Sequence, residues 1–175
     1  MTEEHVLLYP DPRLRQKVEE VGALTNDEKG RVFRMLRLLY EQMGIGLAAP
    51  QIGWMKRLIV INVHPTHDPR HSMAVVNPRI SEESQKKWTM REGCLSFPGI
   101  YGSVERPWAV KIEGQNLEGE NMVFPVSGLA ARCILHEVDH LDGVLFIDRM
   151  SAATMVAIRP KLKRLEQHFK RRGQA

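Results

Sequence analysis

The sequence has few cysteines and no long apolar run. Two cysteines among 175 residues cannot build a disulfide framework, so we expect a reducing compartment in which a free thiol can serve a function. The longest apolar run, residues 58–63, is far too short to cross a bilayer. The acidic first residues lack the basic and then apolar layout of a signal peptide. These absences predict a cytoplasmic protein without a membrane segment.

Internal repeats and low-complexity segments are also lacking, and the ordinary apolar and charged content is typical of a globular protein. Charge is unevenly distributed, because residues 151–175 hold seven basic side chains against one acidic one. We therefore expect a single domain over residues 1–150 and a basic helical extension over 151–175. The extension is either a solvated amphipathic helix that packs Leu162, Leu165 and Phe169 on the body, or a contact for an acidic partner such as ribosomal RNA. Pro160 is expected to start or kink this helix.

Local patterns predict one early helix followed by short strands. Thr25–Glu28 has the polar cap and acidic first turn of a helix start, and apolar residues from Val32 to Met43 follow at helical spacing, up to Gly44. Residues 6–9 could form a short strand or an anchoring arm. Strands are expected at residues 58–63, 74–77, 85–90, 108–112 and 122–126, with a hairpin loop at 114–119. This spacing favours antiparallel pairing.

One stretch indicates metal chemistry. Residues 136–140 read HEVDH, and on a helix His136 and His140 lie one turn apart on the same face, where both rings can bind a single ion. Glu137 can reach the same ion and act as a base beside a metal-bound water. A catalytic site of this kind requires a third protein ligand.

Two protease arrangements fail to supply that ligand. The position of a downstream histidine is occupied by Phe146, and the only later glutamate is Glu166, inside the basic extension. Cys133 shares the helix face but would lie about 7 Å from the ion along the helix axis. Cys94, in a turn where a strand ends, is therefore the candidate ligand, and a zinc metalloprotease is the weaker alternative.

The segment from Gly44 to Gln51 alternates glycine with apolar residues. Glycine in an extended segment is typical of a close approach by a ligand or another backbone, although a helix end running into a tight strand explains the pattern equally well. Gln51 is either a surface residue or an amide donor aimed into a site.

Three segments together, GIGLAAPQ (44–51), EGCLS (92–96) and HEVDH (136–140), resemble the signature motifs of the peptide deformylase family, and residues 9–15 resemble its N-terminal segment. The resemblance implies an α+β fold, with small antiparallel and mixed sheets around a central HExxH helix, an N-terminal helix and a basic C-terminal helix. It implies removal of the formyl group from the N-terminal formyl-methionine of nascent polypeptides, with release of formate. One divalent metal ion is implied, Fe²⁺ as the usual native metal, with Zn²⁺, Ni²⁺ or Co²⁺ able to replace it.

The resemblance also assigns residues. Cys94, His136 and His140 become metal ligands and Glu137 the acid and base. Gln51 and the backbone N–H of Leu95 line the oxyanion site, while Ile45 and Gly46 pair with the peptide main chain.

Other positions have two interpretations each. Leu129 and Cys133 form a wall of the methionine pocket or belong to the core. Arg132 binds a substrate carbonyl or is solvated. Glu92 orients the glycine turn or pairs with Arg106, and Asp139 supports a ligand or is exposed.

Tyr101 and Leu135 depart from the common pattern of the family. A competing hypothesis of another class is a basic-tailed ribosome- or RNA-binding module, in which HExxH is only structural.

Overall fold

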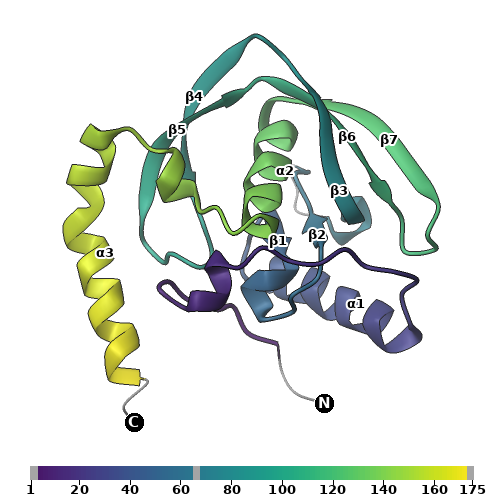
Figure 1. Cartoon of the computed structure of the whole chain (residues 1–175), viewed down its shortest axis with the longest axis horizontal. Helices are drawn as coiled ribbons and strands as arrows, with labels where there is room; N and C mark the ends of the chain where they lie inside the picture. The colour runs from purple at the N-terminus through teal and green to yellow at the C-terminus, as the bar shows by residue number, and fades with distance from the viewer. Residues whose placement is uncertain (1–3, 65–67, 173–175) are drawn as a thin grey trace.

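Two antiparallel sheets surround one central helix, α2 (Gly128–Leu141), in an α+β fold (Figure 1). This computed structural model describes residues 4–64 and 68–172. The five-stranded sheet has the order β1-β2-β3-β6-β7, and β4 pairs with β5 in a separate hairpin. The strands are β1 (Gly46–Ala48), β2 (Leu58–Ile61), β3 (Met73–Glu83), β4 (Lys87–Gly93), β5 (Tyr101–Pro107), β6 (Ala109–Gln115) and β7 (Asn121–Ser127). Every pair in these two sheets is antiparallel, as the spacing predicts.

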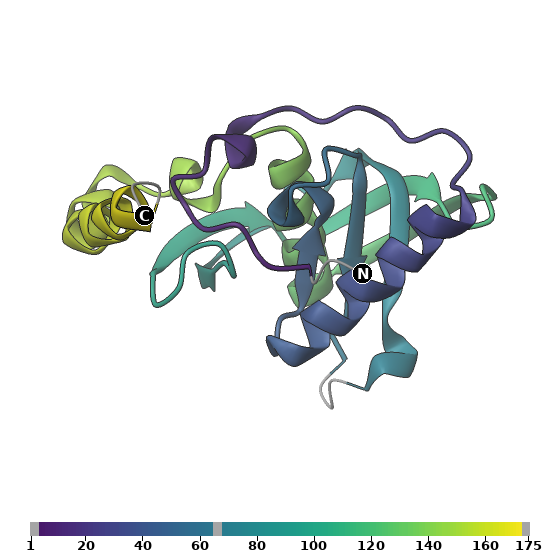
Figure 2. The same ribbon diagram turned by 90° about the horizontal axis from the view of Figure 1, so that it is seen from below.

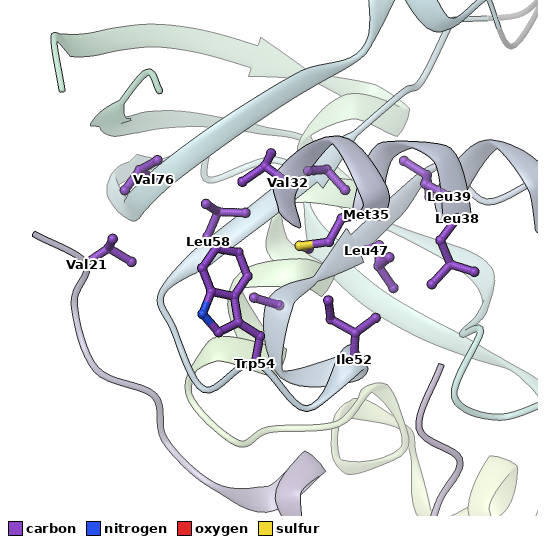
Figure 3. Packing of buried hydrophobic residues seen from close by; sticks show 12 residues of the cluster. Val21, Val32, Met35, Leu38, Leu39, Leu47, Ile52, Trp54, Leu58 and Val76 are labelled. Carbon is purple, nitrogen blue, oxygen red and sulfur yellow. The ribbon is translucent and has the colours of Figure 1, made fainter. Parts of the chain in front are cut away.

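Helix α1 (Asn26–Glu41) begins where expected. The Thr25 hydroxyl accepts from the backbone N–H of Glu28, and the Glu28 carboxylate accepts from the N–H of Thr25, a reciprocal cap. Figure 3 shows the apolar face of α1, with Val32, Met35 and Leu39, packed on Leu47 and Leu58 of the sheet. Met43 does not share this core: the helix ends at Glu41, and Met43 adopts a positive φ and is exposed.

The remaining predictions differ mainly at element boundaries. All five expected strands are present, but β5 was not predicted. Residues 6–9 form an arm rather than a strand, since the N–H of Leu7 donates to Gln51 O and that of Tyr9 donates to Ser96 O, at 2.7 and 2.9 Å. Short 3-10 helices complete the described chain at η1 (Pro12–Arg15), η2 (Ala49–Ile52), η3 (Pro69–His71) and η4 (Phe146–Arg149).

Helix α3 (Ala152–Arg172) stands at one side of the body in both views (Figures 1 and 2). Ile158 and Leu162 are buried in a cluster that also holds Phe146, and Leu165 packs against it. The predicted packing is confirmed for Leu162 and Leu165, whereas Phe169 is not part of this cluster. Pro160 lies within the helix, and the prediction that it begins the helix is wrong. The boundary at residue 150 between body and extension stays a prediction, and residues 173–175 lie outside the described part of the chain. None of the described helices combines the length and hydropathy needed to cross a membrane.

Candidate metal centre and active site

Helix α2 carries the HEVDH stretch through the interior of the protein. Residues 131–141 are all buried, and Ile134, Val138 and Leu141 pack against the five-stranded sheet. This apolar contact fixes the rotation of the helix. As a result, His136 and His140 lie one turn apart with ring centroids separated by 5.1 Å.

Cys94 joins the two histidines from the end of β4. Its Sγ lies 3.2 Å from His140 Nε2, and the ligand atoms of Cys94, His136 and His140 lie within 4.8 Å of one another. The structure thus brings Cys94 to two histidines that lie more than forty residues further along the chain. A thiolate with two imidazoles suits a divalent transition metal, and three protein ligands leave a fourth position free for catalysis. Cys133 is not in the cluster, because its Sγ donates to Ile45 O at 3.2 Å.

Glu92, on β4, orients the first histidine. Its Oε2 accepts from His136 Nδ1 at 3.1 Å, and its carboxylate also accepts two bonds from Arg106, at 2.7 and 3.0 Å. Burial opposes ionisation of Glu92, yet the hydrogen bonds from His136 and Arg106 lower its pKa to about 2. Pairing with Arg106 was one of the two interpretations of Glu92. The carboxylate therefore fixes the ring so that Nε2 faces the donor cluster.

The charged network continues to Asp139, which is buried rather than exposed. Its carboxylate accepts from Arg106 at 2.9 Å and from Arg149 at 2.7 Å. Arg106 thus connects the β4–β5 hairpin, which ends next to Cys94, to helix α2, which carries the two histidines.

The two ligand imidazoles differ in their electrostatics. Burial, together with the nearby charge of His136, holds the pKa of His140 well below its ordinary value. Burial also opposes protonation of His136, but contacts with Cys94 and Glu92 raise its pKa. A neutral His140 has a ring nitrogen available as a ligand.

Glu137 lies beside this cluster with a carboxylate oxygen, Oε2, that is buried and has no hydrogen-bond partner among the described residues. Burial raises the pKa of Glu137 to about 7, the range in which a carboxylate can both accept and release a proton. Gly46 is pressed against it: a Cβ on this residue would lie 2.4 Å from Glu137 Oε1 and 2.7 Å from Cys133 Sγ. The glycine is required here by close approach, as its position in the sequence suggested.

Gln51, in η2, is buried, which contradicts the surface interpretation. Its Oε1 accepts from the backbone N–H of Ala48 at 2.8 Å, which fixes the amide. The Nε2 group then lies 3.4 Å from Cys94 Sγ and 3.1 Å from Ser96 Oγ. A fixed amide donor therefore points at the donor cluster.

A cleft of about 460 Å³ opens over these groups. Its wall includes Leu95, expected in the oxyanion site, and the five residues expected to bind the substrate, which are Ile45, Gly46, Leu129, Arg132 and Cys133. Leu129 is 40% exposed at the mouth, whereas Cys133 is buried.

Arg132 is not solvated, which corrects that alternative. Its guanidinium is buried and donates to Glu92, to Val104 O at 2.9 Å and to Trp88 O at 2.7 Å. These bonds place it in support of Glu92, and a contact with a substrate carbonyl stays a prediction.

Ser96 and Arg149 contribute to the site but were not predicted. Ser96 holds the Gln51 amide and is itself the last residue of the EGCLS segment, so the signal was present. Arg149, in η4, donates to Asp139, and no local sequence pattern predicts this contact.

A thiolate and two imidazoles within 4.8 Å of one another, beside a buried carboxylate and an amide donor, are the arrangement typical of one class of protein, the mononuclear metal-dependent hydrolases. Comparison with known proteins refines this class. The family model described as polypeptide deformylase matches residues 3–155. The chain belongs to the polypeptide deformylase family.

Relatives named peptide deformylase cover most of the chain. The chain is 40% identical to the protein of Rhizobium meliloti (strain 1021) over 86% of its own length and 87% of that protein. It is 42% identical to peptide deformylase 1B of Arabidopsis thaliana, named as chloroplastic/mitochondrial, over 94% of its length. The chain spans about 60% of the length of this and two other plant relatives.

Solved structures agree with the fold. A plant peptide deformylase crystal structure superposes with a TM-score of 0.95 at 40% identity, covering 100% of this chain and 95% of that one. The structure of peptide deformylase from Thermotoga maritima gives a TM-score of 0.81 at 38% identity, covering 86% and 99%. These likenesses confirm the α+β fold.

Proposed function

We propose that this chain is a metal-dependent amide hydrolase that removes the formyl group from the N-terminal formyl-methionine of newly synthesised polypeptides and releases formate. One observation carries the proposal: Cys94 completes a three-donor cluster with His136 and His140 beside Glu137, whose buried Oε2 has no hydrogen-bond partner among the described residues. Family membership supplies the substrate class.

Cys94, His136 and His140 would hold one divalent metal ion. The donor set fits such an ion, since all three ligand atoms converge and Glu137 Oε2 is buried with no hydrogen-bond partner in residues 4–64 and 68–172. When bound, the metal supplies Lewis acidity that makes water nucleophilic near neutral pH. The Cys94 thiolate favours a soft, redox-active ion, so we propose Fe²⁺ natively, with Zn²⁺, Ni²⁺ or Co²⁺ as replacements.

The residues of this chain then divide the work of hydrolysis. Glu137 accepts the proton of the attacking water and later delivers it to the departing amine. Gln51 Nε2 and the backbone N–H of Leu95 donate to the oxygen on which negative charge develops. Because Ala48 already fixes the Gln51 amide, little reorganisation is required during the reaction.

The residues that line the cleft would bind the peptide. Ile45 and Gly46 precede and begin the edge strand β1, where a substrate backbone can pair as an added strand. Leu129 and Cys133 offer apolar surface for the methionine side chain. Arg132 acts through Glu92, whose carboxylate orients His136.

Formate release tests the function. Anaerobically prepared protein of known metal content should release formate from a formyl-Met peptide, and should act neither on the acetyl-Met counterpart nor on internal bonds. Internal cleavage would favour the metalloprotease alternative, for which the described chain offers no ligand downstream of His140. Absence of formate in metal-loaded protein would contradict the proposal.

The basic face of α3 is a candidate contact for the ribosome. Its described basic side chains are exposed and form no ion pair among the residues in the structure; they are Arg159, Lys161, Lys163, Arg164, Lys170 and Arg171. Such a face favours a phosphate backbone, and its binding should weaken with salt.

Glutamine at Lys163, Arg164, Lys170 and Arg171 should reduce ribosome co-sedimentation at low salt, whereas glutamine at Arg37 on α1 should not. Unaltered co-sedimentation would remove the contact. Formate release separates the proposed enzyme from a ribosome- or RNA-binding module without catalysis. Such a module would bind ribosomes but release no formate.

We further propose residues 1–150 as the catalytic domain, 151–175 as its helical extension, and the cytoplasm as the location. Both cysteines are free thiols, which suits a reducing compartment. Fractionation of cells that express the tagged chain checks the location.

A further inference from the structure

The mouth of the cleft is formed on one side by the β4–β5 hairpin. Arg91 and Tyr101 both line the cleft there. The cross-strand pairs Arg91–Ser103 and Gly93–Tyr101 put both side chains on the same exposed face of the hairpin. The Tyr101 ring lies across Gly93, whose missing Cβ would otherwise meet it at 2.5 Å. The Tyr101 ring can occupy this position only because residue 93 has no side chain.

Tyr101 in turn holds the arginine. The guanidinium carbon of Arg91 lies 4.8 Å from the centroid of the Tyr101 ring. A guanidinium held over an aromatic ring can still direct N–H groups to a carboxylate, which it binds through two parallel bonds.

The charge of Arg91 is also not neutralised by an ion pair with another described residue. The cleft is lined by the carboxylates of Glu92 and Glu137 and by the guanidinium groups of Arg91 and Arg132. Glu92, Glu137 and Arg132 are buried, and Glu92 pairs with Arg132. Arg91 is exposed and makes no ion pair or hydrogen bond within residues 4–64 and 68–172. The cleft therefore presents one uncompensated positive charge to solvent.

The position of this charge relates it to the substrate chain. Arg91 precedes Cys94 by three residues along β4, roughly 10 Å at the rise of an extended strand. An extended peptide whose formyl group lies at the Cys94 cluster covers that distance in about three residues. We propose that Arg91 is a specificity-determining residue, which favours an acidic side chain at the third or fourth position of the formylated peptide and disfavours a basic one. This inference rests on the proposed function.

Two peptide series test the proposal: formyl-Met-Ala-Xaa-Ala and formyl-Met-Ala-Ala-Xaa-Ala, with amidated C-termini and Xaa as Glu, Gln or Lys. The ratio of kcat/KM for Glu over Lys should be about three to ten in one series at low salt, because attraction of one charge and repulsion of the other act together. The ratio should fall towards one as added salt screens the exposed charge.

Variants assign the effect to the residue. Arg91→Gln should bring the Glu-over-Lys ratio close to one, and Arg91→Glu should invert it. The matched control is Lys87→Gln, which removes an exposed charge from the same face of β4 outside the cleft. This control should keep the ratio of the unaltered chain.

Equal rates with Glu and Lys in both series, or a preference that survives Arg91→Gln, would overturn the assignment of Arg91 while formate release still supports the proposed function. No formate from any peptide would overturn both.

Discussion

Helices α2 and α3 both carry charged side chains, but they hold them in opposite environments. On α2, Arg132, Glu137 and Asp139 are all buried. On α3 the described basic side chains are exposed. A buried charge is costly unless it is paired, and Arg132 and Asp139 are paired. Glu137 is the exception, because its Oε2 has no hydrogen-bond partner among the described residues, as expected for the catalytic role that we propose.

Glu137→Gln, on the buried helix α2, has the largest expected effect. Removing a general acid and base should lower kcat for formate release by about 100- to 10,000-fold. The free energy of unfolding should not fall, because Glu137 Oε2 has no hydrogen-bond partner to lose in the part of the chain that the structure describes. Steady-state assays and urea unfolding of the metal-loaded protein measure both. Loss of activity accompanied by equal loss of stability would contradict a catalytic role.

Glu92→Gln removes a buried charge that is paired. Arg106 and Arg132 would each lose an ionic partner, so we expect the free energy of unfolding to fall by about 3–5 kcal/mol. Glu105→Gln, on the neighbouring strand β5, is the matched control, since Glu105 is exposed and pairs only with Lys87 among the described residues. Urea unfolding of the two variants should separate them clearly. Similar midpoints would show that the buried network adds little to stability.

Gly46→Ala tests how closely α2 is packed. The added methyl group would meet Glu137 and Cys133 at 2.4 and 2.7 Å, so it should cost about 1–3 kcal/mol of stability and displace the Glu137 carboxylate. Gly30→Ala, in α1, adds the same group 3.7 Å from the nearest side chain and should stabilise the protein slightly, by about 0.5–1 kcal/mol. Thermal unfolding compares the two. A harmless alanine at position 46 would mean that β1 can move away from α2.

The smallest effect is expected on α3. The double substitution Lys163→Gln with Arg164→Gln should change the free energy of unfolding by less than about 0.5 kcal/mol, because neither exposed side chain has an ion-pair partner among the described residues. Leu162→Ala, beside them in sequence, should cost about 2–5 kcal/mol, because Leu162 is buried against the body. Equal effects would place α3 away from the core in solution.

The sequence predicted the parts of the site that depend on local spacing. His136, Glu137 and His140 follow from helical geometry, and Cys94 follows because Cys133 is too far along the same helix. For the glycines of residues 44–51 the sequence left two explanations open, and only the fold shows that Glu137 and Cys133 closely approach Gly46.

What the sequence could not predict depends on strand register. Strand β5 was missed, and with it the reason that Arg106 can contact both Glu92 and Asp139. Arg132 was expected in solvent or on a substrate because an isolated arginine gives no sign of burial, whereas the hairpin brings Glu92 and two backbone carbonyls around it. Contacts of this kind are set by pairing between distant segments, so no local pattern reports them.

Strand β1 has a consequence for the behaviour of the protein at high concentration. It lies at the edge of the five-stranded sheet and is only three residues long. An open edge can template strands from other molecules and so lead to aggregation, and short edge strands limit this hazard. Because β1 is so short, the edge that we propose receives a peptide offers few free backbone groups to a second copy of the chain, and η2 follows it directly at Ala49.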